Sequence, residues 1–183
     1  MTPRTKIALA AAWAAALSFF VFMAVHVLHE GRHGRVPAPA AEVDHLLPEA
    51  VHYLESTRAI GDEWTLFCGV RYLGNSRPAP RIDLYVWEAC QSYRVQGTKL
   101  ATFTGWSVPA VISFQRVRGV YRVVAERQPG DGTDYWPDIR RMFSSDAEQA
   151  VVEMDGTTRT GVGAPSAIFA RLQRRARHEL LRQ

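Results

Sequence analysis

The segment RIDLYVWEACQSYRV, residues 81–95, limits the fold of this chain more than any other part of its sequence. Side chains along a strand point alternately to its two faces, and here both alternating sets are largely apolar. One face would carry Ile82, Leu84, Val86 and Cys90, and the other would carry Tyr85, Trp87, Ala89 and Tyr93. A strand of this kind has to be covered on both sides. The sequence therefore predicts a central strand with a packed layer on each face.

Three further segments predict neighbouring strands. Residues 63–74, EWTLFCGVRYLG, place apolar side chains at every second position. Residues 108–117, VPAVISFQRV, do the same, and an Arg-Gly turn joins them to residues 120–127, VYRVVAER. Four strands joined by short turns predict an antiparallel meander.

A helix is expected ahead of the sheet, in LLPEAVHYLEST, because Ala50, Val51 and Leu54 recur at helical spacing. Pro48 suits the first turn of a helix, so we expect the helix to begin close to it. One helix before a four-stranded antiparallel sheet is an α+β layout of the cystatin-like or NTF2-like kind, in which a curved sheet wraps a helix.

Residues 7–28, IALAAAWAAALSFFVFMAVHVL, contain no formal charge and follow Arg4 and Lys6. About 20 apolar residues in a helix cross the hydrocarbon core of a bilayer. The run predicts an uncleaved transmembrane anchor with the amino terminus in the cytoplasm, and a cleaved signal peptide is the alternative. Residues 1–28 would form the cytoplasmic tip and anchor, and residues 29–41 a linker. The rest of this single-pass protein would lie outside the cytoplasm.

The net charge of +4 does not indicate a nucleic-acid surface, because it is spread unevenly along the chain. Residues 1–40 carry +3, residues 41–143 are neutral and residues 144–183 carry +1. A nucleic-acid-binding domain gathers its basic residues on its folded part. The membrane, through residues 7–28, is a predicted partner, and nucleic acid is not.

Cys68 and Cys90 are the two cysteines of the chain, in a domain that we expect in an oxidising compartment. If NSRPAP centres a turn so that facing positions sum to 158, Cys68 faces Cys90 across two antiparallel strands. A disulfide is the favoured interpretation. A pair of buried thiols stays open, because free cysteine packs as a small hydrophobic residue.

The stretch PGDGTDYWPDIRRMF carries three acids, Asp131, Asp134 and Asp138. We expect them to shape a turn and a helix start, with Asp134 capping or preceding the helix and Asp138 in its first turn. A ligand or partner site that includes Tyr135, and catalysis, are the alternatives. The spacing does not fit a calcium loop, and we predict neither a metal site nor a cofactor.

Two tryptophans are weaker candidates for ligand contact. Trp87 and Trp106 would line an aromatic cleft if their side chains converged, although aromatic residues in sheets more often belong to the core.

The stretch SAIFARLQRRARHELLRQ, residues 166–183, predicts a basic amphipathic helix after a flexible segment at residues 146–165. Its basic side chains include Arg171, Arg174, Arg175 and Arg177. In one interpretation the helix packs on the domain with a solvated basic face. In the other it leaves the domain and contacts anionic lipid or an acidic partner.

Two stretches, YVWEACQSY and VPAVISFQRVRGVYRVVAERQPGDGTDYWPDIRRMF, resemble a small uncharacterised extracytoplasmic domain of bacterial membrane proteins and lipoproteins. That domain sometimes occurs beside sensor-type metallopeptidases. The resemblance covers residues 51–143 and implies an extracytoplasmic location but no established activity.

We therefore interpret residues 42–145 as an extracytoplasmic, non-catalytic binding module. Its expected partner is a membrane protein, an envelope component or a small apolar ligand. The alternative from another class is an extracytoplasmic hydrolase or transferase that uses Asp131, Asp134 and Asp138.

Overall fold

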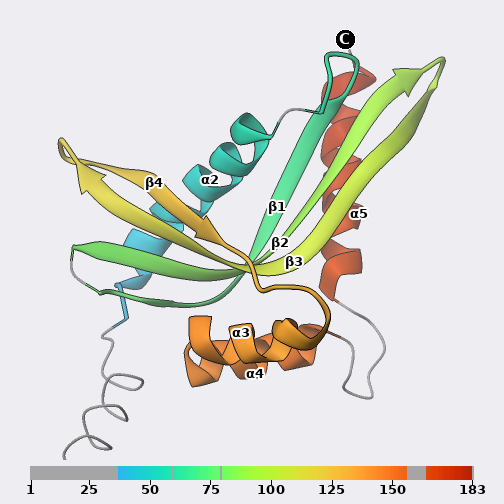
Figure 1. Cartoon of the computed structure of the whole chain (residues 1–183). Helices are drawn as coiled ribbons and strands as arrows, with labels where there is room; N and C mark the ends of the chain where they lie inside the picture. Colours follow the sequence, from blue (N-terminus) through green and yellow to red (C-terminus); the bar gives the residue numbers. More distant parts are fainter. Residues whose placement is uncertain (1–36, 59, 79, 156–163, 183) are drawn as a thin grey trace, which may run out of the picture. The chain divides into compact units, whose positions relative to one another are not determined.

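The computed structural model describes residues 37–58, 60–78, 80–155 and 164–182, which form an α+β domain. Its centre is a four-stranded antiparallel sheet in the order β1-β2-β3-β4 (Figure 1). The strands are β1 (Thr65–Ser76), β2 (Arg81–Gln96), β3 (Lys99–Val117) and β4 (Val120–Arg127). The helices are α2 (Ala40–Thr57), α3 (Tyr135–Met142), α4 (Ser145–Met154) and α5 (Ala164–Leu180), and a 3-10 turn, η1 (Gly132–Asp134), precedes α3.

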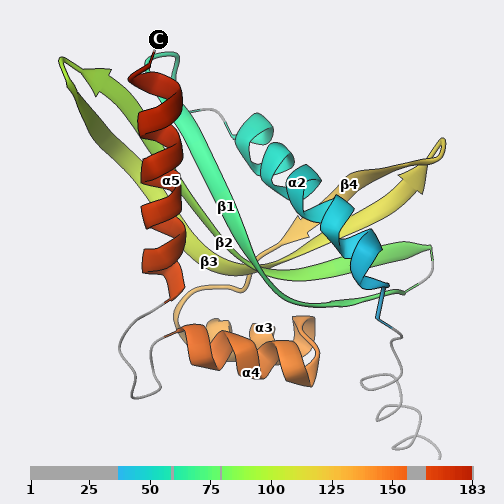
Figure 2. The same cartoon turned by 180° about the vertical axis from the view of Figure 1, so that it is seen from behind.

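Both faces of β2 are covered, as its sequence predicts. On one face Leu84, Val86 and Cys90 pack with the buried side of α2. On the other face Tyr85 and Trp87 pack with side chains of α3, α4 and α5. Figures 1 and 2 show the long, strongly bent sheet with these helices around it.

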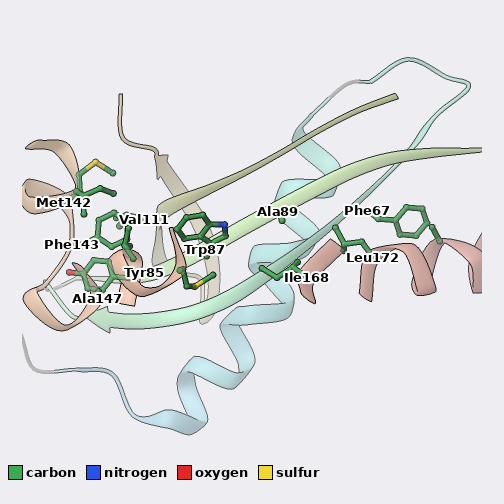
Figure 3. Close-up of a cluster of buried hydrophobic side chains, with 14 of the residues drawn as sticks. Phe67, Tyr85, Trp87, Ala89, Val111, Met142, Phe143, Ala147, Ile168 and Leu172 are labelled. Carbon is green, nitrogen blue, oxygen red and sulfur yellow. The ribbon is translucent and has the colours of Figure 1, made fainter. Parts of the chain in front are cut away.

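The cluster that joins the sheet to α3, α4 and α5 has two ends (Figure 3). Tyr85 and Trp87 lie near Phe143 and Ala147 at one end. At the other end, Ile168 and Leu172 of α5 lie with Ala89 and Phe67 (Figure 3). The helices that follow the sheet in sequence therefore share one face of it.

The register of β1 and β2 confirms the predicted pairing. Thr65 lies opposite Tyr93 and Cys68 opposite Cys90, and the pairing continues to Tyr72 before a bulge at Gly74. Strand β3 begins at Lys99, nine residues before the predicted strand, because residues 99–107 pair with the second half of β2. Side chains in this part of β3 are mostly exposed or half-buried, so their polarity shows little alternation.

Helix α2 begins at Ala40, so the expectation that it starts beside Pro48 is wrong. Its buried stripe runs through Val43, Leu46, Ala50 and Leu54 without a break. Pro48 lies inside the helix on its exposed side, where the missing backbone N–H leaves the apolar stripe intact. The expected linker, residues 29–41, is also too long, since Ala38 is buried and its N–H donates to the Asn75 side chain.

The expected flexible segment, residues 146–165, contains helix α4 instead. The hydroxyl of Ser144 caps α4 by accepting the N–H of Ala147 at 3.4 Å. Ala147, Val151 and Met154 recur at helical spacing and are buried, which explains why the helix forms.

Across the described ranges, no helix is both long and apolar enough to cross a membrane. The predicted anchor, residues 7–28, lies outside those ranges.

Candidate functional site

Helix α5 packs on the sheet through Ile168, Leu172 and Ala176, which are at most 3% exposed. Gly69 of β1 permits this close approach, because a Cβ atom there would lie 3.0 Å from Cγ2 of Ile168. The apolar face of α5 is therefore part of the domain core. This arrangement corresponds to the packed interpretation of the helix.

The four candidate arginines of α5 have different surroundings. Arg175 forms a bidentate ion pair with Glu55 of α2, at 2.6 and 3.2 Å. Its guanidinium also lies 5.0 Å from the ring centre of Phe67. Arg171, Arg174 and Arg177 are exposed, and within the described part of the chain none of them pairs with a carboxylate.

The free edge of β1 runs beside these arginines. The N–H of Cys68 donates to Glu55 at 2.8 Å and therefore points away from β2. In an antiparallel sheet this outward direction recurs at every second residue, so the backbone groups of Val70 and Tyr72 also point outward. Among the described residues, no group forms a hydrogen bond with the outward N–H or C=O of these two residues.

A groove of about 520 Å³ follows this edge between α2 and α5. Its walls include Leu47 and Val51 of α2 and Leu172 of α5, and its floor is β1 from Cys68 to Val70. A second hollow of about 630 Å³ continues the groove along Val70, Arg71 and Tyr72, with Arg171 and Arg174 on its α5 side. We call the two hollows together the β1 edge groove.

The basic side chains of the β1 edge groove outnumber its acidic ones. Arg71, Arg171, Arg174 and Arg175 line it, and Asp44 is the acid among its lining residues. Within the described ranges, Arg71 also has no carboxylate partner. The groove therefore combines an apolar wall, unpaired backbone groups and an excess of positive charge.

The three acids after the sheet do not lie in this groove. Asp138 accepts the N–H of Gly130 at 2.9 Å and pairs with Arg141 at 2.6 Å, so it holds the turn against α3. Asp131 and Asp134 are exposed, and the Asp134 side chain does not cap α3. The acids surround the start of the helix as expected, although Asp138 rather than Asp134 makes the stabilising side-chain contacts.

Tyr135, the aromatic candidate beside these acids, packs against the core. Its ring meets Trp136 edge to face, with 5.1 Å between the ring centres. Burial, together with the charge of Asp155, raises the pKa of Tyr135 to about 12. The phenol therefore keeps its proton at neutral pH.

The two candidate tryptophans lie on opposite faces of the sheet and do not form one cleft. Trp87 is buried in the cluster with α3, α4 and α5, and it donates to Ser107 at 2.7 Å. Trp106 packs on the α2 side, where Arg58 lies 4.5 Å from its ring centre.

The indole N–H of Trp106 donates at 2.9 Å to Glu88, a residue that the sequence analysis did not single out. Glu88 is fully buried in β2, and one carboxylate oxygen, Oε2, has no hydrogen-bond partner in the described part of the molecule. Gln128 donates to its other oxygen at 2.8 Å, and Arg58 lies 3.5 Å from the same atom. An acid between Trp87 and Ala89, in the apolar middle of the central strand, was the available sequence signal.

Burial raises the pKa of the Glu88 carboxyl from 4.5 to about 7, and the nearby Glu126 carboxylate adds to this rise. The hydrogen bond from Trp106 and the charge of Arg58 act in the opposite direction. Arg58 also pairs with Glu126 and so connects the end of α2 to both carboxylates.

The predicted disulfide is confirmed. Cys68 and Cys90 are bonded, with 4.1 Å between their Cα atoms, and they face each other across β1 and β2. The bond is buried below α2, and Cys68 also contributes to the β1 edge groove.

Comparisons with family models, with curated proteins and with solved structures gave no match to this chain. Three or more metal-ligating side chains do not gather anywhere among the residues that the structure describes.

Proposed function

We propose that this protein is a membrane-anchored, extracytoplasmic binding module that takes up an extended, acidic segment of another protein in the β1 edge groove. The observation that carries the proposal is the outward-facing, unpaired backbone of Val70 and Tyr72 at the floor of that groove. Exposed sheet edges bind extended peptides by adding a strand, and the main-chain hydrogen bonds supply much of the affinity.

The charge of the groove selects the partner. Arg71, Arg171 and Arg174 lack carboxylate partners within the described ranges, so acidic side chains of an added strand would neutralise them. The contact between Glu55 and Cys68 supports this choice, because a carboxylate already accepts a backbone N–H at the same edge. Arg175 is occupied by that carboxylate and would act as a fixed wall of the groove.

Residues 7–28 supply the anchor in this proposal, and the charge-free length of the run supports it. The bent sheet against α2 is consistent with a cystatin-like or NTF2-like layout, which by itself implies no activity. The resemblance of residues 51–143 to an extracytoplasmic domain and the disulfide between Cys68 and Cys90 both favour a location outside the cytoplasm.

The test is a binding titration on the full chain in nanodiscs. The probe is a fluorescent octapeptide of alternating Val and Asp, and the matched peptide alternates Val and Lys. We expect the Asp peptide to bind at least about tenfold more tightly, with an affinity that falls as salt is added. Equal binding of both peptides would contradict the proposal.

Val70→Pro separates strand addition from simple charge attraction. Proline removes an outward N–H while the hydrogen bonds between β1 and β2 remain, and Val70→Ala controls for the lost side chain. We expect Val70→Pro to weaken binding about three- to tenfold relative to Val70→Ala, which corresponds to one backbone hydrogen bond. Equal affinities of two folded variants would exclude strand addition at Val70.

A further inference from the structure

A second surface lies at the end of the domain where α2 begins. Three contacts gather separate segments there: Ala38 donates to the Asn75 side chain, and the Glu42 carboxylate binds both Arg77 and the Tyr121 hydroxyl. The start of α2, the β1–β2 turn and the β3–β4 turn all lie at this end (Figures 1 and 2). We call the β3–β4 part of this surface, residues 116–124, the hairpin tip.

The hairpin tip is basic. Arg116, Arg118 and Arg122 are all exposed, and its sequence RVRGVYRVV contains no acid. As far as the structure describes the chain, none of these three arginines forms a salt bridge with a carboxylate. Glu42 at this end is already held by Arg77 and Tyr121. Arg116 donates its Nε–H to the carbonyl of Gly119 at 3.1 Å, which leaves its two terminal nitrogens, and the guanidinium groups of Arg118 and Arg122, to bind an outside anion.

The hairpin tip also exposes apolar side chains. Val117 and Val120 face each other in the register and are 46% and 53% exposed, and Val124 is 46% exposed. The turn between the strands is tight, with φ of 51° at Arg118 and 86° at Gly119. Valines at the tip of a short turn, flanked by arginines, form an amphipathic surface.

We propose that the hairpin tip docks on an anionic phospholipid surface. The valines would enter the headgroup region, and the arginines would bind lipid phosphates, which guanidinium groups do in bidentate fashion. This inference rests on the membrane anchor of the proposed function. Eleven residues lie between Leu28 and Ala40, so a fully extended connection reaches at most about 40 Å and keeps the domain near the bilayer.

A lipid surface fits better than an acidic protein because the tip offers exposed valines and unpaired arginines together on one small turn. Each arginine near an anionic bilayer adds electrostatic attraction, which decreases as salt is added. In this inference the hairpin tip takes the place of α5 as the membrane contact, because the apolar face of α5 packs into the core and cannot enter a bilayer at the same time.

The experiment uses the full chain with Val120→Cys, labelled with nitrobenzoxadiazole in the absence of reductant so that the native disulfide stays intact. The matched control is Phe103→Cys, because Phe103 is 70% exposed and lies on the β2–β3 hairpin instead. Each labelled protein is placed in nanodiscs of phosphatidylcholine alone and of phosphatidylcholine mixed with phosphatidylglycerol.

We expect the emission of the Val120 label to shift to the blue in the discs with phosphatidylglycerol, with about a twofold gain in intensity. The Phe103 label should not respond, and the triple variant R116Q/R118Q/R122Q should abolish the shift. The inference is overturned by an absent shift, by an equal shift at both labels, or by a shift that survives the triple variant. A shift in detergent that grows with protein concentration would assign the tip to a second copy of this chain and would also overturn it.

The outcomes separate this inference from the function on which it rests. If the chain stays in the discs and binds the Asp peptide but its Val120 label shows no shift, only the lipid contact of the tip is ruled out. If the chain elutes apart from the discs, the anchor is ruled out and this inference with it. If only peptide binding is lost, the result contradicts the role proposed for the β1 edge groove.

Discussion

Glu55 of α2 and Arg175 of α5 form a bidentate ion pair across the edge of β1, with distances of 2.6 and 3.2 Å. The two helices cover opposite faces of the sheet, so this pair is a direct link between the two layers. The same carboxylate accepts the N–H of Cys68 at 2.8 Å. The width of the β1 edge groove is therefore set by contacts that meet at Glu55.

Replacing the cation of this pair should destabilise the domain. We expect Arg175→Gln to lower the free energy of unfolding by about 1–2 kcal/mol, because Glu55 would lose a charged partner in a half-buried place. The free energy of unfolding of Arg175→Lys should lie between those of the native chain and Arg175→Gln, since an ammonium group cannot form the bidentate pair. Urea denaturation measures the difference. Arg177→Gln on the same helix is the control, and an equal loss there would contradict the prediction.

Truncating the buried face of α5 should have a larger effect. We expect Leu172→Ala to lower the free energy of unfolding by about 3 kcal/mol, as cavities in a core do. Arg174→Ala, an exposed change two residues along the helix, should stay within about 0.5 kcal/mol. Thermal and urea unfolding provide the measurement. A small effect of Leu172→Ala would revive the interpretation that α5 leaves the domain.

Glu88 should make the stability of the domain depend on pH near neutrality. Its pKa is about 7 in the folded chain and close to 4.5 in the unfolded chain, so between these values the folded state holds the extra proton. The stabilisation from this proton is complete below about pH 4.5 and is lost as the pH rises through 7. The loss amounts to about 3 kcal/mol, from the size of the shift in pKa.

Glu88→Gln tests this dependence because glutamine imitates the protonated acid. We expect the variant to gain stability over the native chain as the pH rises from 5 to 8, by up to about 3 kcal/mol in urea unfolding curves. Trp106→Phe removes a hydrogen bond that lowers the pKa of Glu88, so it should move the midpoint of the native profile upward. Parallel profiles for the native chain and Glu88→Gln would refute the assignment to Glu88.

Breaking the disulfide should also lower stability. The bond joins residues 22 apart, and closing a loop of this length contributes about 3 kcal/mol in the chain-entropy model. We expect the double variant C68A/C90A, and the reduced native chain, to lose about that much in urea unfolding. Alkylation of unreduced, denatured protein provides the check, and labelling of both cysteines would show that the bond is absent.

Much of the sheet was predictable from local pattern. The two apolar faces of β2 required cover on both sides, and the short turns fixed neighbouring strands well enough to place Cys68 opposite Cys90. The start of α2 was missed because Pro48 suits a first turn, whereas the buried stripe from Val43 onward determined the helix. Packing across the chain prevailed over the preference of one residue.

The candidate site was less accessible to sequence analysis because it depends on long-range packing. The predicted meander places its first strand at a sheet edge, but no local pattern shows that α2 and α5 stand on either side of that edge. Glu55 and Arg175 are 120 residues apart in sequence, so their ion pair cannot be read from spacing. The basic character of α5 was visible, but which of its arginines already has a partner was not.

The late position of α5 in the sequence has a consequence for biosynthesis. Ile168 and Leu172 cover Phe67, which is made about 100 residues earlier, corresponding to roughly 5–20 s of translation. During that interval the strands can already pair with their neighbours, while the apolar face that receives α5 remains open to solvent. A nascent chain halted before Ile168 would therefore present this face to chaperones and proteases, and its release from them would coincide with the docking of α5.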